Sequence, residues 1–233
     1  MLEKQMNIKG IMIDYGDTLA YTDEAANEVH GKKVLSILRK HGYVSGSEHV
    51  NSTFAALYRS SSTGEMKDLR EFYSIFLRKL NVPEEKALIN QLIEARNRFY
   101  VPAVKLYDGV IPTLSTLQKK YALALVSNCA VGTIDIIKSL GLTEFFDQIV
   151  LSYEIGIRKP EKRIYLETLR RTQLPADECV FVADEISDLE GARSVGIKTM
   201  LIHQGSNTLS EAKNPDFKPD FECDHISQIT KYL

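Results

Sequence analysis

The chain has 233 residues, which is enough for one large domain or for a core with an inserted unit. Its hydrophobic and charged fractions, 44% and 26%, are typical of a globular protein. The formal net charge of −2 gives no reason to expect a nucleic-acid partner, which requires a basic patch, and no apolar stretch is long enough to span a membrane.

The three cysteines are few and widely separated. Cys129, Cys179 and Cys223 show neither the close pairing of a zinc site nor the even number of a disulfide framework. Such usage is typical of a reducing compartment, so the sequence predicts a cytoplasmic protein.

Short apolar runs rich in β-branched residues predict five strands, and helical patterns separate most of them. The expected strands are residues 8–14, 122–127, 148–151, 179–184 and 197–202. The expected helices between the later strands are residues 112–120, 131–140, 161–172 and 187–195. Nearly continuous apolar strands that alternate with helices indicate a parallel sheet covered on both faces, so we expect an α/β fold with a Rossmann-like core.

The segment after the first strand breaks this alternation, because it contains several helical patterns and no convincing strand. Thr22 or Asp23 is expected to cap a first helix. Asp68 and Glu71 have the spacing of a capping box, followed by an apolar stripe at helical spacing. Pro83 is expected to open another helix.

The helical segment therefore divides the chain into two predicted domains. Residues 1–20 and 104–233 form the α/β core, and residues 21–103 form an inserted α-helical cap domain. A cap inserted after the first strand is expected to hang over the edge of the sheet where the strands end.

Polar residues follow the predicted strands at four places. Taken singly each has an ordinary explanation, since an aspartate that ends a strand is usually a turn former and a Lys-Pro pair is commonly a surface turn. Parallel topology, however, brings the carboxyl ends of the strands to one edge. The four places are residues 14–19, residues 127–128, residues 158–160 and residues 184–188.

These residues together suit chemistry on a phosphoryl group. Clustered carboxylates repel one another unless a cation neutralises them, and oxygen ligands without His or Cys suit Mg²⁺. An aspartate such as Asp14 can attack phosphorus and form an aspartyl-phosphate, while Lys159 screens the negative charges and Ser127 donates a hydrogen bond.

The sequence resembles the haloacid dehalogenase (HAD) superfamily, in the phosphatase-like branch with a helical cap after the first strand. Four segments carry the resemblance in the family's order: IMIDYGDTL, LALVSN, GIRKPEKRIY and CVFVADEISDLEGARSVG. The segment LYDGVIPTLSTLQKKY also resembles the part of the family that re-enters the core after the cap.

The resemblance implies a role for each matching residue. Asp14 is the nucleophile, and Lys159 is a further catalytic candidate; Asp17 is a catalytic candidate only because it is the acidic residue next to Gly16. The metal ligands it implies are Asp14, the Gly16 carbonyl and Asp184, with support from Asp188. The phosphate-binding candidates are Ser127, Asn128, Lys159 and Thr18, of which Thr18 helps to organise the first loop.

One position departs from the phosphatase pattern. Gly16 stands where the family usually has an aspartate that serves as general acid and base, which is worth about 10²–10⁴-fold in rate. Three alternatives are open. The substrate has a good leaving group, such as an acyl phosphate; or Asp17, Glu185 or a cap residue replaces the acid; or the protein is a slow or inactive relative that binds phosphate ligands.

The predicted function is thus a Mg²⁺-dependent phosphoric-ester or acyl-phosphate hydrolase that acts on a small phosphorylated metabolite through an aspartyl-phosphate at Asp14. The alternative is a catalytically weak or inactive ligand-binding protein of the same fold. A haloacid dehalogenase is less favoured, because the chain keeps both Asp184 and Asp188. No nucleic-acid or membrane partner is expected, and the protein is predicted to be a monomer or homodimer.

Overall fold

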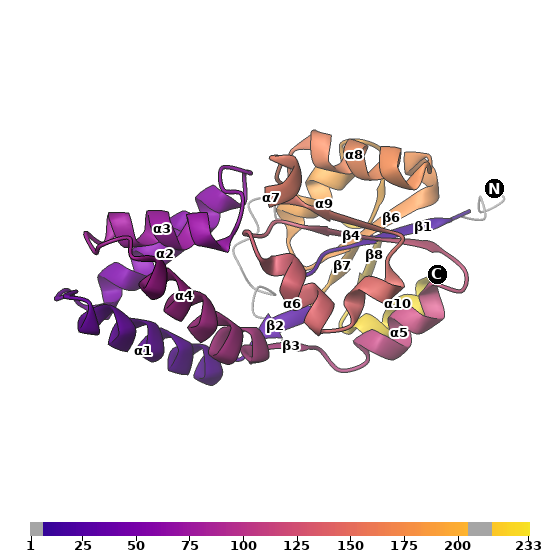
Figure 1. Cartoon of the computed structure of the whole chain (residues 1–233). Coiled ribbons are helices and arrows are strands. Elements are labelled where there is room, and N and C mark those ends of the chain that lie inside the picture. The colour runs from indigo at the N-terminus through magenta and orange to yellow at the C-terminus, as the bar shows by residue number, and fades with distance from the viewer. Residues whose placement is uncertain (1–6, 205–215) are drawn as a thin grey trace.

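A single parallel sheet forms the centre of the computed structural model, which describes residues 7–204 and 216–233 (Figure 1). All neighbouring strands in it run parallel. In spatial order the strands are β5 (Gln148–Leu151), β4 (Ala122–Ser127), β1 (Gly10–Ile13), β6 (Cys179–Ala183), β7 (Lys198–Ile202) and β8 (Phe221–Cys223). The predicted α/β class with a Rossmann-like parallel core is confirmed.

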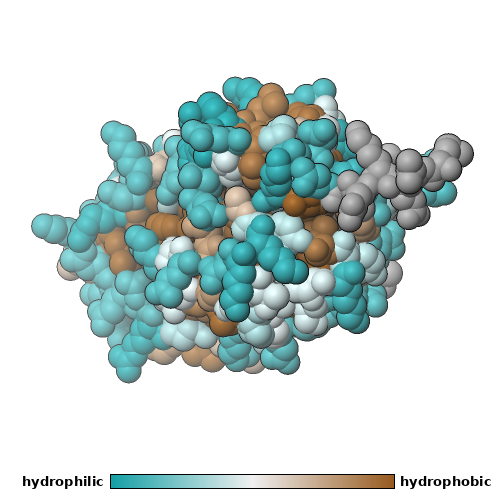
Figure 2. Space-filling view, turned by 90° about the vertical axis from the view of Figure 1, so that its right-hand side faces the viewer, coloured by the Kyte–Doolittle hydropathy of each residue, from teal (hydrophilic) through white to brown (hydrophobic). Residues whose placement is uncertain are grey.

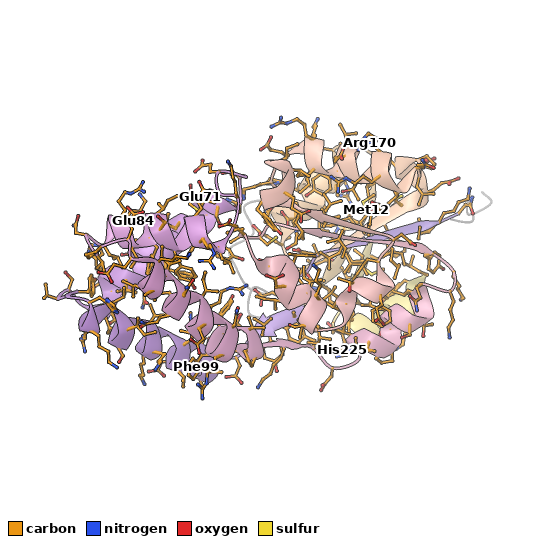
Figure 3. All side chains as sticks on the ribbon, viewed as in Figure 1. Met12, Glu71, Glu84, Phe99, Arg170 and His225 are labelled. Atoms are coloured by element: carbon orange, nitrogen blue, oxygen red, sulfur yellow. The ribbon has the colours of Figure 1, made fainter. Side chains whose placement is uncertain are left out.

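Helices cover both faces of this sheet, which explains why the strands are apolar almost throughout. Ile11 and Ile13 of β1 belong to one buried cluster and Met12 to the other, as alternation along a strand requires. In Figure 3, Met12 lies between the sheet and the helices drawn above it. One face packs against α5 (Val110–Leu117), α6 (Thr133–Ser139) and α10 (Ile229–Tyr232), and the other against α8 (Lys162–Thr172) and α9 (Ile186–Arg193).

Short turns of helix complete this part of the chain. They are α7 (Ser152–Ile155), η3 (Leu142–Phe145), η4 (Ala176–Glu178) and η5 (Ile226–Gln228).

A separate helical lobe extends from the carboxyl-end edge of the sheet (Figure 1). Two short antiparallel strands, β2 (Ala20–Thr22) and β3 (Val104–Leu106), connect it to the rest of the chain. Between them lie α1 (Glu24–Lys40), α2 (Ser47–Ser61), α3 (Leu69–Lys79), α4 (Lys86–Ala95), the π-helical turn η1 (Arg96–Tyr100) and η2 (Val101–Ala103). We call residues 24–103 the helical insert; it supplies nearly all of one buried hydrophobic cluster, which Val131 of the core joins.

Side-chain caps begin two of the insert's helices as the sequence predicts. The Asp23 carboxylate accepts a hydrogen bond from the Ala26 amide at 3.0 Å. The Asp68 carboxylate accepts hydrogen bonds from two amides at the start of α3, at 2.8 and 2.9 Å. Glu71 reaches back to the amide of Lys67 and not to that of Asp68, so the predicted capping box is shifted by one residue.

The outer surface of the α/β part is mostly polar. Figure 2 shows hydrophilic residues spread over the face opposite the insert, with apolar residues in separate areas between them. Within residues 7–204 and 216–233, no helix combines the length and the apolar character that crossing a membrane requires.

The strand order places a switch point at β1, in the middle of the sheet. From β1 the chain continues to β4 and β5 on one side and then crosses to β6, β7 and β8 on the other. Ligands of parallel α/β sheets bind outside the carboxyl ends of the strands at such a point. The loops after β1, β4 and β6 therefore meet beneath the helical insert.

Candidate active site

The carboxylate of Asp14 lies at the carboxyl end of β1, in the middle of the sheet. Its backbone amide still donates to the Val182 carbonyl of β6 at 3.0 Å, which fixes its position. Its side chain is buried and accepts a hydrogen bond from the Tyr15 amide at 2.7 Å. Burial raises the pKa of Asp14, although the positive charge of Lys159 acts in the opposite direction.

Lys159 connects two of the carboxylates that the sequence analysis selected. Its ammonium group lies 2.7 Å from Asp14 Oδ2 and 2.7 Å from Asp188 Oδ2, and its side chain is only 1% exposed. Burial alone would lower the pKa of Lys159, but the two carboxylates outweigh it and the pKa lies above the usual value. The lysine therefore stays charged in the site at neutral pH.

The loop that carries Lys159 is held by Asn128, which follows β4. The Asn128 side-chain amide donates to the Lys159 carbonyl at 2.9 Å, and its oxygen accepts from the Lys159 amide at 2.8 Å. The Lys159–Pro160 peptide bond is cis. Because both ends of the Asn128 side chain bond to this backbone, its geometry is that of a residue that positions Lys159.

Asp184 follows β6 and receives a hydrogen bond from inside the protein. The Thr18 hydroxyl donates to Asp184 Oδ1 at 3.1 Å, and Thr18 itself is fully buried. Burial, with a smaller contribution from the nearby Asp17 carboxylate, raises the pKa of Asp184 to about 6. Thr18 thus contacts the neighbouring carboxylate and does not line the cleft.

Two residues that support the site escaped the sequence analysis. Gln204 donates to the Thr18 carbonyl at 3.2 Å and accepts from the Ile226 amide at 2.9 Å. The Tyr165 hydroxyl donates to the Asp188 carbonyl at 2.7 Å. Gln204 lies outside the four motif segments, and Tyr165 ends one of them without any sign in the sequence of its role, because each acts through the backbone of a residue far away in sequence.

The first loop is a tight turn in which Asp17 takes the left-handed conformation. Its φ is +54°, and its amide donates to the Ala20 carbonyl at 2.8 Å. This conformation normally favours glycine, so an aspartate here is unusual. Asp17 is half-buried, and this burial raises its pKa.

An open cleft of about 290 Å³ joins these residues to the helical insert. Asp14, Asp17 and Asp184 line it on the core side. The side chain of Glu185 is at the rim, where the Ser187 hydroxyl donates to it at 2.7 Å. Further lining residues are Gly16, Ser127, Asn128, Lys159 and Asp188 from the core, and Tyr58 and Tyr100 from the insert.

The oxygen atoms at the cleft suit a magnesium ion. Within residues 7–204 and 216–233, no three His, Cys, Asp or Glu side chains are arranged as a metal site by themselves. Mg²⁺, however, usually takes only one or two carboxylates and completes its shell with water and substrate oxygens. The charge of Asp184 acts on Asp14, and Gly16 lines the same cleft, so two carboxylates and a backbone carbonyl are available together.

Comparison with known proteins decides the family. The model of a family described as haloacid dehalogenase-like hydrolase matches residues 44–202. The chain belongs to this family. It is therefore a HAD-like hydrolase, and the resemblance drawn from its four motifs is confirmed.

Relatives of the HAD-like chain match it over 67% to 95% of its length. It is 29% identical to the glyceraldehyde 3-phosphate phosphatase of Methanopyrus kandleri, covering 95% of each chain. It is 29% identical to the haloacid dehalogenase-like hydrolase domain-containing protein 3 of Mus musculus, over 78% of each. A phosphoglycolate phosphatase of Mesorhizobium japonicum is 26% identical over 67% of this chain and 68% of its own.

Solved structures share the HAD-like fold. A 2-haloacid dehalogenase from Pseudomonas syringae superposes with a TM-score of 0.73 at 24% identity, covering 96% of this chain and 97% of the other. A HAD phosphatase from Thermococcus onnurineus gives 0.70 at 22% identity, covering 97% and 98%. At these identities the likeness establishes the fold and leaves the reaction open.

Proposed function

We propose that the chain is a magnesium-dependent phosphatase that acts on a short phosphorylated metabolite through an aspartyl-phosphate at Asp14. One observation carries the proposal: the buried ammonium of Lys159 lies between Asp14 and Asp188, and all three residues line the cleft. Asp14 supplies the nucleophile, and Lys159 supplies a fixed positive charge beside it. The phosphatases among the relatives support the same reaction class.

The first chemical step transfers the phosphoryl group to the protein. A carboxylate oxygen of Asp14 forms a bond to phosphorus while the bond from phosphorus to the leaving oxygen breaks, and that oxygen takes the electron pair and a proton. Lys159 and the Ser127 hydroxyl bind the phosphoryl oxygens in this proposal. Both residues line the cleft next to Asp14.

The second step releases phosphate. Water adds to phosphorus and gives up a proton, and the bond between phosphorus and the Asp14 oxygen breaks, which regenerates the carboxylate. Mg²⁺, held by Asp14, Asp184 and the Gly16 carbonyl, would neutralise negative charge on the phosphoryl group. Asp188 supports the site by pairing with Lys159, while Asn128 and Thr18 hold Lys159 and Asp184 in place.

We assign the proton transfers to Asp17. It lines the cleft, and burial raises its pKa, which increases the protonated fraction near neutral pH. Glu185 is a weaker candidate, because it is exposed and already accepts a hydrogen bond from Ser187. The helical insert acts as a closing cap in this account and excludes bulk water from the cleft.

The cysteines bear on the cellular compartment of the protein. We place the enzyme in the cytoplasm, because Cys129, Cys179 and Cys223 are all buried free thiols. The expected partner is the small phosphorylated substrate, and the expected assembly is a monomer or a homodimer.

Phosphate release from the full-length protein tests the proposed activity. With Mg²⁺ present, we expect hydrolysis of glyceraldehyde 3-phosphate, 2-phosphoglycolate or acetyl phosphate, and we expect Asp14→Asn to abolish it. Asp177→Asn is the matched control, since that exposed aspartate precedes β6 at the opposite end of the sheet. Undiminished phosphate release by Asp14→Asn would refute the proposal.

Inactivity of the wild-type protein would instead favour the alternative function, a non-catalytic binder of phosphate ligands. Gly16 is the observation that supports this alternative, because the usual acid is missing there. Tight binding of 2-phosphoglycolate without any turnover would distinguish that case.

A further inference from the structure

A buried arginine lies where the helical insert returns to the core. Arg96 begins the π-helical turn η1, and only 6% of its surface is exposed. Its guanidinium donates to the Gly132 carbonyl at 2.7 Å and to Asn97 Oδ1 at 3.1 Å. Figure 3 shows Phe99 of the same turn at the lower end of the insert, close to β2 and β3.

The charge of Arg96 has no acidic partner among the described residues. All ion pairs recorded for residues 7–204 and 216–233 involve other cations. A buried positive charge is costly unless an anion pairs with it, and neutral oxygen acceptors compensate only in part. The site is therefore suited to an anion that arrives from outside the protein.

Two further buried polar atoms nearby lack hydrogen-bond partners. His30 Nε2 is one of them, in a residue that is 7% exposed. The His30 ring lies 5.5 Å from the ring of Tyr100, and burial together with the charge of Arg96 lowers its pKa to about 4. The second atom is the Tyr15 hydroxyl, whose residue lines the active-site cleft.

A small cavity beside the cleft is lined by both His30 and Arg96. It has a volume of about 30 Å³, and His30, Arg96 and Tyr100 are among its lining residues. Tyr58 and Tyr100 line both this cavity and the active-site cleft, so the cavity lies next to the cleft, on the side of the insert. Since one water needs about 10–15 Å³, the space holds a group of two or three heavy atoms.

We propose that Arg96, assisted by His30, binds the carboxylate of a substrate whose phosphoryl group lies at Asp14, and so selects short phosphorylated carboxylic acids. This inference rests on the proposed phosphatase function and names its substrate class. The flat guanidinium matches a carboxylate in two parallel hydrogen bonds. A second phosphate is larger than the cavity admits, and an aldehyde or alcohol leaves the arginine charge unpaired.

The test compares two ligands that differ in one group. 2-Phosphoglycolate and ethyl phosphate have the same phosphate ester and the same number of carbons, but only the first has a carboxylate. Their dissociation constants are measured by calorimetry with the full-length Asp14→Asn protein and Mg²⁺, so that no turnover is needed. We expect 2-phosphoglycolate to bind about 10- to 100-fold more tightly.

Substitutions of Arg96 and Arg98 distinguish recognition of the carboxylate from a structural role of the arginine. Arg96→Gln is expected to remove the preference for 2-phosphoglycolate while leaving the affinity for ethyl phosphate within about threefold. Arg98→Gln removes the same charge from an exposed position and should leave the preference intact. Arg96→Lys keeps the positive charge but lacks the planar guanidinium, so it should give an intermediate preference for 2-phosphoglycolate. This variant also tests the inference if Arg96→Gln fails to fold.

The outcomes are distinguishable from failure of the phosphatase proposal. Equal affinities of the two ligands, or a preference that survives Arg96→Gln, would overturn the inference even if the wild-type enzyme hydrolyses phosphate esters. A preference that disappears in Arg96→Gln would support it even if turnover were absent. A purely structural role of Arg96 would weaken both ligands equally.

Discussion

The Lys159 ammonium between Asp14 and Asp188 defines the site at the scale of single residues. Each contact is 2.7 Å, and all three side chains are at most 10% exposed. Since buried charges are costly unless they are paired, these three side chains must keep their contacts with one another in the folded protein. In the proposed reaction, this arrangement orients the Asp14 nucleophile and places a positive charge next to the bound phosphoryl group.

Gly16 stands at the position where the resemblance to the family implies a general acid. Its φ lies outside the left-handed region, and a Cβ added there would meet no atom within 4 Å, so the loop has room for a larger residue. We expect Gly16→Asp to raise kcat/KM for alkyl phosphates by about 10-fold or more, because a general acid is typically worth 10²–10⁴-fold. Acetyl phosphate, with its good leaving group, should change little.

A substitution of Asp17 tests the same general-acid role from the neighbouring residue. If Asp17 supplies the acid, Asp17→Asn lowers alkyl phosphate turnover far more than acetyl phosphate turnover, and Gly16→Asp restores part of the loss. Equal losses for both substrates would show that Asp17 serves the fold of the loop, where it holds a left-handed conformation.

At the scale of elements, the helical insert depends on local signals such as the cap of α3. Asp68 satisfies two amides at the start of that helix. We expect Asp68→Ala to lower the free energy of unfolding by about 1 kcal/mol, the usual value of an N-cap. Urea denaturation measures it, with the exposed Asp177→Ala as control. A change no larger than that of the control would contradict the role of the cap.

Elements with strong periodicity could be predicted, and very short ones could not. The strands at residues 122–127 and 148–151 match β4 and β5 to the residue, because their burial makes them continuously apolar. The three-residue strands β2, β3 and β8 went undetected, since three residues carry no periodicity.

Two helices of the helical insert also differ from the prediction, one in its start and one in being unpredicted. The helix expected to open at Pro83 begins three residues later, as α4, with Glu85 at its N-cap. The helix α2 was not located from the sequence, because its apolar residues are spaced too irregularly; only Val50, Leu57 and Ser61 are buried.

Only the site residues that belong to motifs or follow the ends of strands could be predicted from the sequence. Parallel topology was enough to bring Asp14, Lys159 and Asp184 to one edge of the sheet. The partners of these residues depend on tertiary contacts, such as the hydrogen bond from Gln204 to Thr18 across 186 positions. Arg96 was missed for the same reason, because nothing in its neighbourhood marks it as buried and unpaired.

The whole molecule joins a sheet-centred part to a helical insert through β2 and β3, and the cleft lies between them. Both parts contribute to the walls of the cleft. A metal ion and a substrate bound there are therefore expected to stabilise the whole chain, because they bind the folded protein and not the unfolded one.

The dependence of stability on pH and magnesium follows from the acidic cluster. Burial raises the pKa of Asp184 from 3.8 to about 6, so its contribution to stability is complete below pH 4 and is lost as the pH rises through 6. Asp188 shifts in the same direction. Without metal, these two groups therefore destabilise the protein progressively between pH 4 and 6.

Magnesium should oppose this loss, because it binds the ionised carboxylates. We expect millimolar Mg²⁺ to raise Tm by several degrees at pH 7.5 and by much less at pH 4.5. Differential scanning calorimetry at the two pH values, with potassium chloride of equal ionic strength as control, measures it. An equal effect at both pH values would contradict a metal site built on these carboxylates.

Rapid acid quenching tests the central claim, the covalent intermediate at Asp14, most directly. The wild-type protein is mixed with Mg²⁺ and acetyl phosphate carrying a radiolabelled phosphoryl group, quenched within one turnover, and digested for peptide mapping. We expect label on the peptide that contains Asp14, and none in Asp14→Asn. Rapid phosphate release with no labelled peptide, or with label on another residue, would contradict it.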